Sequence, residues 1–153
     1  MPKSPKVFRG FTLIELLVVI GILAVLLTIT LIAINPARQF SQSNNTKRRS
    51  DILTILNAVG QYAADHKGAL PTGIDATVKH VSTAGADICL ALVSDYTSAL
   101  PVDPLTNNGA PVTDCAVAGG YDTGYTITKS ATNNRITVSA PAAELGDVIQ
   151  VTR

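Results

Sequence analysis

The sequence predicts an α+β protein in which a long N-terminal helix packs on a small antiparallel sheet. Three patterns support this prediction. An uncharged apolar run extends from Leu16 to Ile34, apolar residues recur at helical spacing from Ile52 to His66, and two C-terminal segments alternate with a period of two. These patterns are typical of a helix buried all round, of an amphipathic helix and of half-buried strands, respectively. We therefore expect a helix with a membrane-spanning half and an amphipathic half, followed by a globular head.

The apolar run is long enough to cross a membrane. Its only polar side chains are Thr28 and Thr30. A helix over residues 11–34 would reach about 36 Å, which exceeds the roughly 30 Å of a bilayer core. Basic residues precede it without any acid, so the positive-inside rule places the N-terminus in the cytoplasm and the rest of the chain across the membrane. These residues are Lys3, Lys6 and Arg9.

Glu15 does not fit a plain membrane anchor, because it lies inside the apolar stretch. A lone acid in hydrocarbon costs on the order of 2.5–3.5 kcal/mol on insertion scales, and it marks a functional candidate. If the chain were cut after Gly10, Phe11 would carry a new amine. An ammonium and a carboxylate attract strongly at low dielectric. The spacing therefore suggests that Glu15 of one copy pairs with the N-terminal amine of a neighbouring copy.

The segment Gly10-Phe11-Thr12-Leu13-Ile14-Glu15 resembles the class III leader and cleavage site of the type IV pilin family, which includes pilins, competence pilins and type II secretion pseudopilins. The resemblance implies that residues 1–10 are a leader removed after Gly10 by a prepilin peptidase and N-methyltransferase. Phe11 would become the methylated N-terminus, and Glu15 would align subunits in a filament. An assembly platform and a cytoplasmic ATPase are implied as further partners.

Two other interpretations of the N-terminus stay open. A secretory signal peptide would have a shorter apolar core and an A-x-A-like cleavage site after it, and no clean site of that kind follows Ile34. A plain signal anchor would explain the length of the run, but it would leave Glu15 without a role. The N-terminus of the mature protein would distinguish these interpretations from the pilin-like one.

Residues 35–67 are expected to continue the helix. Pro36 predicts a bend or an end of the apolar helix. Residues 37–46 are mostly polar and predict helix of low stability that could become extended. From Lys47 an apolar face recurs at helical spacing, while Arg48, Arg49, Asp51, Gln61 and Asp65 are expected mostly outside it. Gly68 and Pro71 are expected to end the helix.

Residues 68–153 are expected to form the head. A short strand is expected at 77–81 and a short helix at 87–93. A hairpin is predicted from 124–129 and 135–140, with its turn at 130–134, and a third strand from 148–152. Leu100-Pro101-Val102-Asp103-Pro104 predicts a rigid turn in which Asp103 bonds nearby backbone. This pentapeptide resembles a segment that recurs in major pseudopilins and in many Gram-positive-type pilins.

Composition limits the classes of function. The 153 residues suit one domain plus an anchor, and the net charge is +1. Without the three basic residues of the leader, nine Lys and Arg would remain against 11 acids, for a net charge of −2, which is not typical of a nucleic-acid-binding domain. Cys89 and Cys115 lie in the part predicted to be outside, where disulfides persist, so we expect them to be paired. Free thiols are the alternative.

Other chemical sites have less support. Asp103, Asp114 and Asp122 are calcium candidates, because major pseudopilins bind calcium in a comparable loop, but their spacing matches no fixed motif and solvated turn aspartates are preferred. The basic run of Lys47, Arg48 and Arg49 could contact DNA or anionic lipid. The preferred interpretation is that these residues form a solvated face or make ion pairs between subunits. His66 is expected in the core or at its rim. Neither it nor His80 belongs to a catalytic arrangement, so we expect no enzyme activity and no cofactor.

We therefore expect a structural subunit of a type IV pilus filament. Its precursor would cross the cytoplasmic membrane once, and the assembled filament would lie on the cell surface. A type II secretion-like pseudopilin and a membrane-anchored extracytoplasmic binding domain that never polymerises are the alternatives. The sequence leaves open whether the filament serves adhesion, motility, DNA uptake or secretion.

Overall fold

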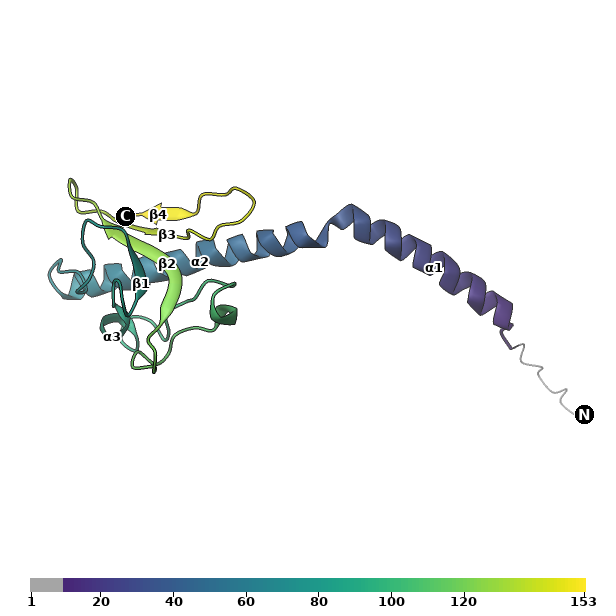
Figure 1. Cartoon of the computed structure of the whole chain (residues 1–153), viewed down its shortest axis with the longest axis horizontal. Helices are drawn as coiled ribbons and strands as arrows, with labels where there is room; N and C mark the ends of the chain where they lie inside the picture. The colour runs from purple at the N-terminus through teal and green to yellow at the C-terminus, as the bar shows by residue number, and fades with distance from the viewer. Residues whose placement is uncertain (1–9) are drawn as a thin grey trace, which may run out of the picture. The chain divides into compact units, whose positions relative to one another are not determined.

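The computed structural model of the protein describes residues 10–153. The chain divides into two compact units, residues 1–39 and 40–153. The first unit contains the apolar helix α1, and the second contains most of helix α2 and the whole sheet (Figure 1). The predicted α+β class is confirmed, and the helix that packs on the sheet is α2.

Helix α1 extends over Leu13–Ile34 and begins at a complete capping box. Thr12 is the N-cap: its side-chain oxygen accepts a hydrogen bond from the Glu15 N–H, and Glu15 bonds back to the Thr12 backbone. Such reciprocal bonds satisfy donors that the first helical turn leaves free. At the other end, Asn35 has a left-handed conformation with φ 47°, which ends α1.

Helix α2 extends over Pro36–Asp65 without interruption. Proline at the first helical position is favourable, because its missing N–H would have no partner there and its φ suits the helix. Asn35 also accepts a hydrogen bond from the Arg38 N–H at its side-chain oxygen. The predicted break at the Asn35-Pro36 step is confirmed. The polar segment that follows is helical here, as predicted.

The end of α2 follows the predicted signals. Lys67 and Gly68 have positive φ values of 56° and 89°, and the Gly68 N–H donates to the Ala63 carbonyl at 2.7 Å. A left-handed glycine that bonds back to the last turn is a common helix C-terminus. The chain therefore leaves the helix direction at Gly68.

The sheet has four antiparallel strands in the order β1-β2-β3-β4. Their bounds are Lys79–Ser82, Asp122–Lys129, Ile136–Ser139 and Gln150–Thr152. The predicted hairpin is β2 and β3, with Ile127 opposite Val138. The short early strand begins two residues later and ends one residue later than predicted, and the last strand excludes Val148, which is exposed. Two short helical segments, α3 (Cys89–Leu92) and η1 (Asn107–Gly109), lie between β1 and β2.

The core of the head lies between α2 and the sheet. Apolar residues of α2 pack with residues of β1, β2 and β3 in one buried cluster, which includes Ile52, Ile55, Leu56, Val59, Val81, Tyr125, Ile127 and Val138. One prediction about α2 is wrong: Arg48 and Asp51 are buried rather than outside the packing face, because Asp103, Glu144 and Tyr125 supply polar partners for them there. His66 lies at the rim of the core, one of the two places expected for it: its side chain is exposed, and its ring stacks on Tyr62, which packs against the core.

Candidate functional site

The predicted processing point lies at an exposed chain segment. Gly10 is exposed and Phe11 is 81% exposed, and both precede the first turn of α1. Thr12 fixes that turn through the capping box. The rest of the expected leader, residues 1–9, lies outside the described residues.

The carboxylate of Glu15 uses only one of its two oxygens within the described residues. Oε2 accepts hydrogen bonds from the Thr12 backbone N–H at 2.8 Å and from Thr12 Oγ1 at 2.7 Å. Among residues 10–153, no donor bonds to Oε1. A carboxylate accepts at both oxygens, so Glu15 can hold its own helix cap and still bind a second donor.

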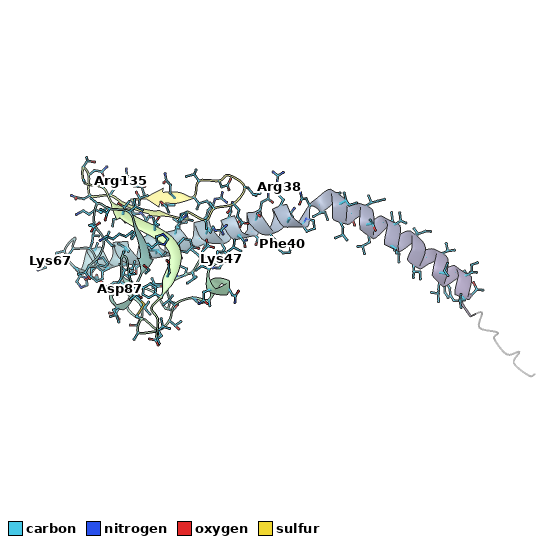
Figure 2. The ribbon with its side chains drawn as sticks, viewed as in Figure 1. Arg38, Phe40, Lys47, Lys67, Asp87 and Arg135 are labelled. Carbon is cyan, nitrogen blue, oxygen red and sulfur yellow. A yellow bond between two sulfur atoms is a disulfide. The ribbon has the colours of Figure 1, made fainter. Side chains whose placement is uncertain are left out.

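Helix α1 carries no buried side chain, and its side chains project on all sides (Figure 2). It is the one helix, among the described residues, that is long and apolar enough to cross a membrane. Every residue of α1 is exposed, and they are apolar apart from Glu15, Thr28 and Thr30. Its surface requires hydrocarbon or other apolar helices.

In the head, the basic run is engaged in ion pairs within the chain. Arg48 is fully buried and donates from Nε and Nη2 to the two carboxylate oxygens of Asp103, at 2.6 and 3.1 Å. Arg49 bonds Asp147 at 2.6 Å, and Lys47 bonds Asp51 at 2.9 Å. The predicted solvated or DNA-contacting surface is therefore wrong for Arg48. Its partners are carboxylates of the same head, and the Asp103 contact raises the pKa of the guanidinium above its ordinary value.

Glu144 joins the loop before β4 to the same cluster. Its carboxylate accepts hydrogen bonds from Arg48 at 2.7 Å, from Asn44 at 2.9 Å and from Ser41 at 2.9 Å. These donors lower the pKa of Glu144 below its ordinary value, with Arg48 the largest cause. The Asn45 side chain adds two bonds to the Glu144 backbone, at 2.8 and 2.9 Å. This cluster, which we name the Arg48 cluster (Ser41, Asn44, Asn45, Arg48, Asp103, Glu144), fastens α2 to two loops of the head.

The three calcium candidates are not brought together. Among the described residues, no group of three or more acidic, histidine or cysteine side chains could hold a metal ion. Asp103 is fully buried, and it bonds Arg48 and the Leu105 backbone N–H. Asp114 and Asp122 each accept a backbone N–H two residues on, as turn aspartates do. The prediction that Asp103 bonds nearby backbone in a turn is confirmed. The prediction that its carboxylate is exposed to solvent is wrong.

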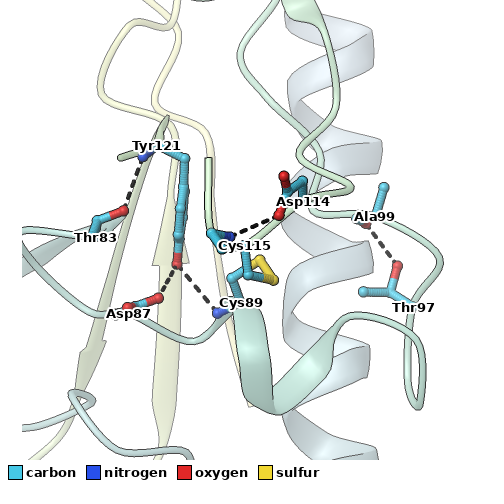
Figure 3. Close-up of a disulfide and its surroundings, with 9 residues drawn as sticks. Thr83, Asp87, Cys89, Thr97, Ala99, Asp114, Cys115 and Tyr121 are labelled. Atoms are coloured by element: carbon cyan, nitrogen blue, oxygen red, sulfur yellow. Dashed lines mark hydrogen bonds between the residues drawn. A yellow bond between two sulfur atoms is a disulfide. The ribbon is translucent and has the colours of Figure 1, made fainter. Parts of the chain in front are cut away.

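Cys89 and Cys115 form the disulfide that the sequence predicts, with a separation of 26 residues (Figure 3). Tyr121 lies beside it: its hydroxyl donates to Asp87 at 2.8 Å and accepts from the Cys89 N–H at 3.2 Å. Burial, with the bond to Asp87, raises the pKa of Tyr121 above its ordinary value. The disulfide closes a loop that contains Asp103, so one loop is held both covalently and through the Arg48 cluster.

Glu144 and Asn45 were missed by reasoning from the sequence. The spacing in the sequence carries a signal for Asn45, although not for Glu144. Ser41, Asn44, Asn45 and Arg48 continue, at steps of three and four residues, the helix face that Ile52 and Leu56 occupy further on. A polar stripe in line with a buried apolar stripe indicates a buried polar contact rather than a solvated face.

Comparison with known proteins gives one match. Residues 5–31 match the family model of the prokaryotic N-terminal methylation motif. No curated protein and no solved structure matches the chain. The matched range contains Gly10, Phe11, Glu15 and most of α1, which are the features described above. The chain therefore carries the prokaryotic N-terminal methylation motif, and the match ends before the head begins.

Proposed function

We propose that the protein is a structural subunit of a type IV pilus filament. In this proposal the leader is cut after Gly10, Phe11 becomes the methylated N-terminus, and α1 holds the subunit in the cytoplasmic membrane until assembly. The match to the N-terminal methylation motif supports the pilin-like part of this proposal. The observation that carries the filament itself is Glu15, the one acid in an otherwise uncharged apolar helix.

The geometry of Glu15 supports pairing between copies. Its Oε2 is engaged in the cap with Thr12, whereas Oε1 has no donor among the described residues. An ammonium at Phe11 of an adjacent copy would supply that donor. In an apolar bundle this pair would be favoured, because an unpaired charge there is costly. The same α1 surface that contacts lipid before assembly would contact other α1 helices afterwards.

The head supports a mechanical rather than a catalytic role. No buried side-chain polar atom of the described residues lacks a hydrogen-bond partner. We propose that the head acts as a rigid body without a cofactor. The runner-up is a type II secretion-like pseudopilin, and a third candidate is a membrane-anchored extracytoplasmic domain that does not polymerise.

The test compares Glu15→Gln with Glu15→Ala in cells that assemble the protein. Glutamine can keep the capping box with Thr12 but carries no charge, whereas alanine loses both. Both variants should lose surface filaments while the chain stays in the membrane fraction. Filaments from Glu15→Gln would show that the cap, and not the charge, is what Glu15 supplies.

Mass spectrometry of the mature protein tests processing separately. We expect a methylated N-terminus at Phe11. An N-terminus at Met1, or one beyond Ile34, would contradict the proposal. Wild-type chains that are processed but never form surface filaments would favour the pseudopilin or the non-polymerising domain.

A further inference from the structure

Three large apolar side chains of the head are exposed near the Arg48 cluster. Phe40, Leu105 and Leu145 are 72%, 66% and 52% exposed, respectively. Phe40 begins the head's part of α2 (Figure 2). Leu105 lies two positions after Asp103, and Leu145 directly follows Glu144. We name Phe40, Leu105 and Leu145 the apolar trio.

Two loops carry the last two members of the trio, and both are fastened to α2. They are the loop that contains η1 and the loop between β3 and β4, and both extend past the sheet towards the start of the head's part of α2 (Figure 1). Asp103 Oδ1 accepts hydrogen bonds from the Leu105 N–H at 2.9 Å and from Arg48 at 3.1 Å. The Glu144 N–H donates to Asn45 at 2.9 Å. The fold therefore holds the trio near one stretch of α2.

The backbone of Leu145 has an unfavourable conformation. Its φ is 60°, and that of the following Gly146 is 75°. A left-handed conformation brings the Cβ of a residue other than glycine close to the following carbonyl oxygen. Among the described residues, Leu145 is not one of those that pack against the core of the head. Strain at an exposed apolar residue therefore supports a contact outside the head.

The carboxylates that flank the two loop residues of the trio are paired with cations of α2. Asp103 and Glu144 both bond Arg48, and Asp147 bonds Arg49 at 2.6 Å. A charge next to a low-dielectric medium is costly unless it is paired. Paired carboxylates also repel phosphate groups less than free ones do. This surface therefore suits contact with a phospholipid layer.

The membrane surface lies close to this part of the chain. Helix α1 has 22 residues, which span about 33 Å, and a bilayer core is roughly 30 Å thick. Ile34, the last residue of α1, therefore reaches the edge of the core. Phe40 follows six positions later, and six residues of helix span about 9 Å. The headgroup layer is about 5–7 Å deep on each side, so Phe40 lies within or next to it whatever the angle at Asn35.

We propose that the apolar trio enters the headgroup layer of the membrane that α1 crosses, so that the head of a stored subunit rests on phospholipid. Leucine and phenylalanine side chains of interfacial segments are buried at this depth. The proposal rests on the membrane anchoring in the proposed function and does not require filament assembly. Lipid is the occupant that the chain itself supplies, because every anchored copy has it next to Phe40.

Val78 provides a contrast within the head. It is 69% exposed and directly precedes β1. Its neighbour Lys79 pairs with Asp75 of the same segment and, in the sheet, with Ile127 of β2. Single exposed apolar residues are common on protein surfaces, so we infer no partner for Val78. It is a matched reference for the two leucines of the trio.

The experiment uses the full chain in vesicles of phosphatidylcholine and phosphatidylglycerol. The two cysteines of the chain are paired, so an introduced cysteine is the single free thiol and can carry an environment-sensitive fluorophore. The labelled variants are Phe40→Cys, Leu105→Cys, Leu145→Cys and, as the control, Val78→Cys. A second set of vesicles contains phosphatidylcholine with a nitroxide on its headgroup, which quenches fluorophores in that layer.

Labels at positions 105 and 145 should show blue-shifted emission and should lose intensity in the nitroxide vesicles, as the label at position 40 does. The label at position 78 should show neither effect. Adding Leu145→Glu should reduce the quenching at position 105, because a charged side chain leaves the apolar boundary. Adding Val78→Glu should leave that quenching unchanged. Equal effects of the two glutamate substitutions would overturn the inference.

The pattern of quenching separates the remaining outcomes. Quenching at position 40 but not at positions 105 and 145 would overturn the inference and leave the proposed function intact. A blue shift at position 145 without quenching would show contact with a second head rather than with lipid, and it would also overturn the inference. Equal quenching at positions 145 and 78 would show that the head has no preferred face towards the membrane. Absence of quenching at position 40 would remove the membrane anchoring itself, and with it the proposed function.

Discussion

The guanidinium of Arg48 and the carboxylate of Asp103 form a two-point ion pair, with both side chains completely buried. The residues are 55 positions apart in the sequence, so the pair joins α2 to the Leu-Pro-x-Asp-Pro turn. A buried ion pair is not by itself a gain over apolar packing. Once it has formed, however, removing one partner leaves the other charge buried.

Asp103→Ala should therefore destabilise the head strongly. Breaking a buried pair typically costs 3–5 kcal/mol, and because Glu144 would still contact Arg48, we expect about 3 kcal/mol. The measurement is denaturant unfolding of the full chain in detergent, followed by a signal from the head. Arg49→Ala is the control: its pair with Asp147 is exposed, so the loss should stay below about 1 kcal/mol. Equal losses in the two variants would contradict a special role for the buried pair.

Glu144 should make the stability of the head sensitive to acid. Its folded-state pKa is lowered, with the hydrogen bond from Arg48 the largest cause. The stabilisation from this group is then complete above the pKa of the unfolded chain and is lost as the pH falls through the lower folded-state value. Melting temperatures measured between pH 7 and pH 2 should fall in the acid range, and Glu144→Gln should flatten part of that fall. An unchanged pH profile in Glu144→Gln would refute this assignment.

The disulfide should contribute substantially to the stability of the head. The cysteines are 26 residues apart, and for a loop of this size the chain-entropy model gives about 3–4 kcal/mol. We expect Cys89→Ala/Cys115→Ala to unfold at clearly lower denaturant concentration than the oxidised wild type. Adding a reductant should lower the midpoint of the wild type and leave that of the double variant unchanged. If the reductant also lowers the midpoint of the double variant, its effect on the wild type does not come from this disulfide.

Two glycines of the head should respond in opposite directions to alanine. At Gly85 a Cβ would lie 2.3 Å from the His80 carbonyl oxygen, so Gly85→Ala must displace backbone and should destabilise by about 1–3 kcal/mol. At Gly60 the site is open and helical, so Gly60→Ala should stabilise by about 0.5–1 kcal/mol. Thermal unfolding of both variants checks the pair. Destabilisation by Gly60→Ala would indicate a contact that the described residues do not provide.

Much of the N-terminal unit could be predicted from the sequence, because its determinants are local. In an apolar environment, a single uncharged segment must form a helix, because its backbone groups can bond only to one another. This requirement does not depend on the rest of the chain. The capping box of α1 joins Thr12 to Glu15, which are three positions apart, and the two neighbouring residues Asn35 and Pro36 end that helix. The β2–β3 hairpin could also be predicted from the sequence, because its two strands are close in the chain and their side chains alternate with a period of two.

The partners of Arg48 could not be predicted in the same way. A basic run at the start of a predicted amphipathic helix is usually solvated, and the polar stripe that includes Arg48 indicates a buried polar contact without indicating which residues make it. Asp103 and Glu144 reach it from 55 and 96 residues away, and only the packing of two loops against α2 brings them together. The same holds for the calcium candidate Asp103, because the guanidinium that bonds its carboxylate lies 55 residues away in the sequence.

The sequence by itself determined the membrane-length helix, the leader motif and the position of Glu15, since each depends on residues that are neighbours in the chain. The tertiary structure decided which charges of the head are buried and paired. The physical reason is that a charge can be buried only where opposite charges and hydrogen-bond donors converge on it, and that convergence is a property of the folded head rather than of any single segment.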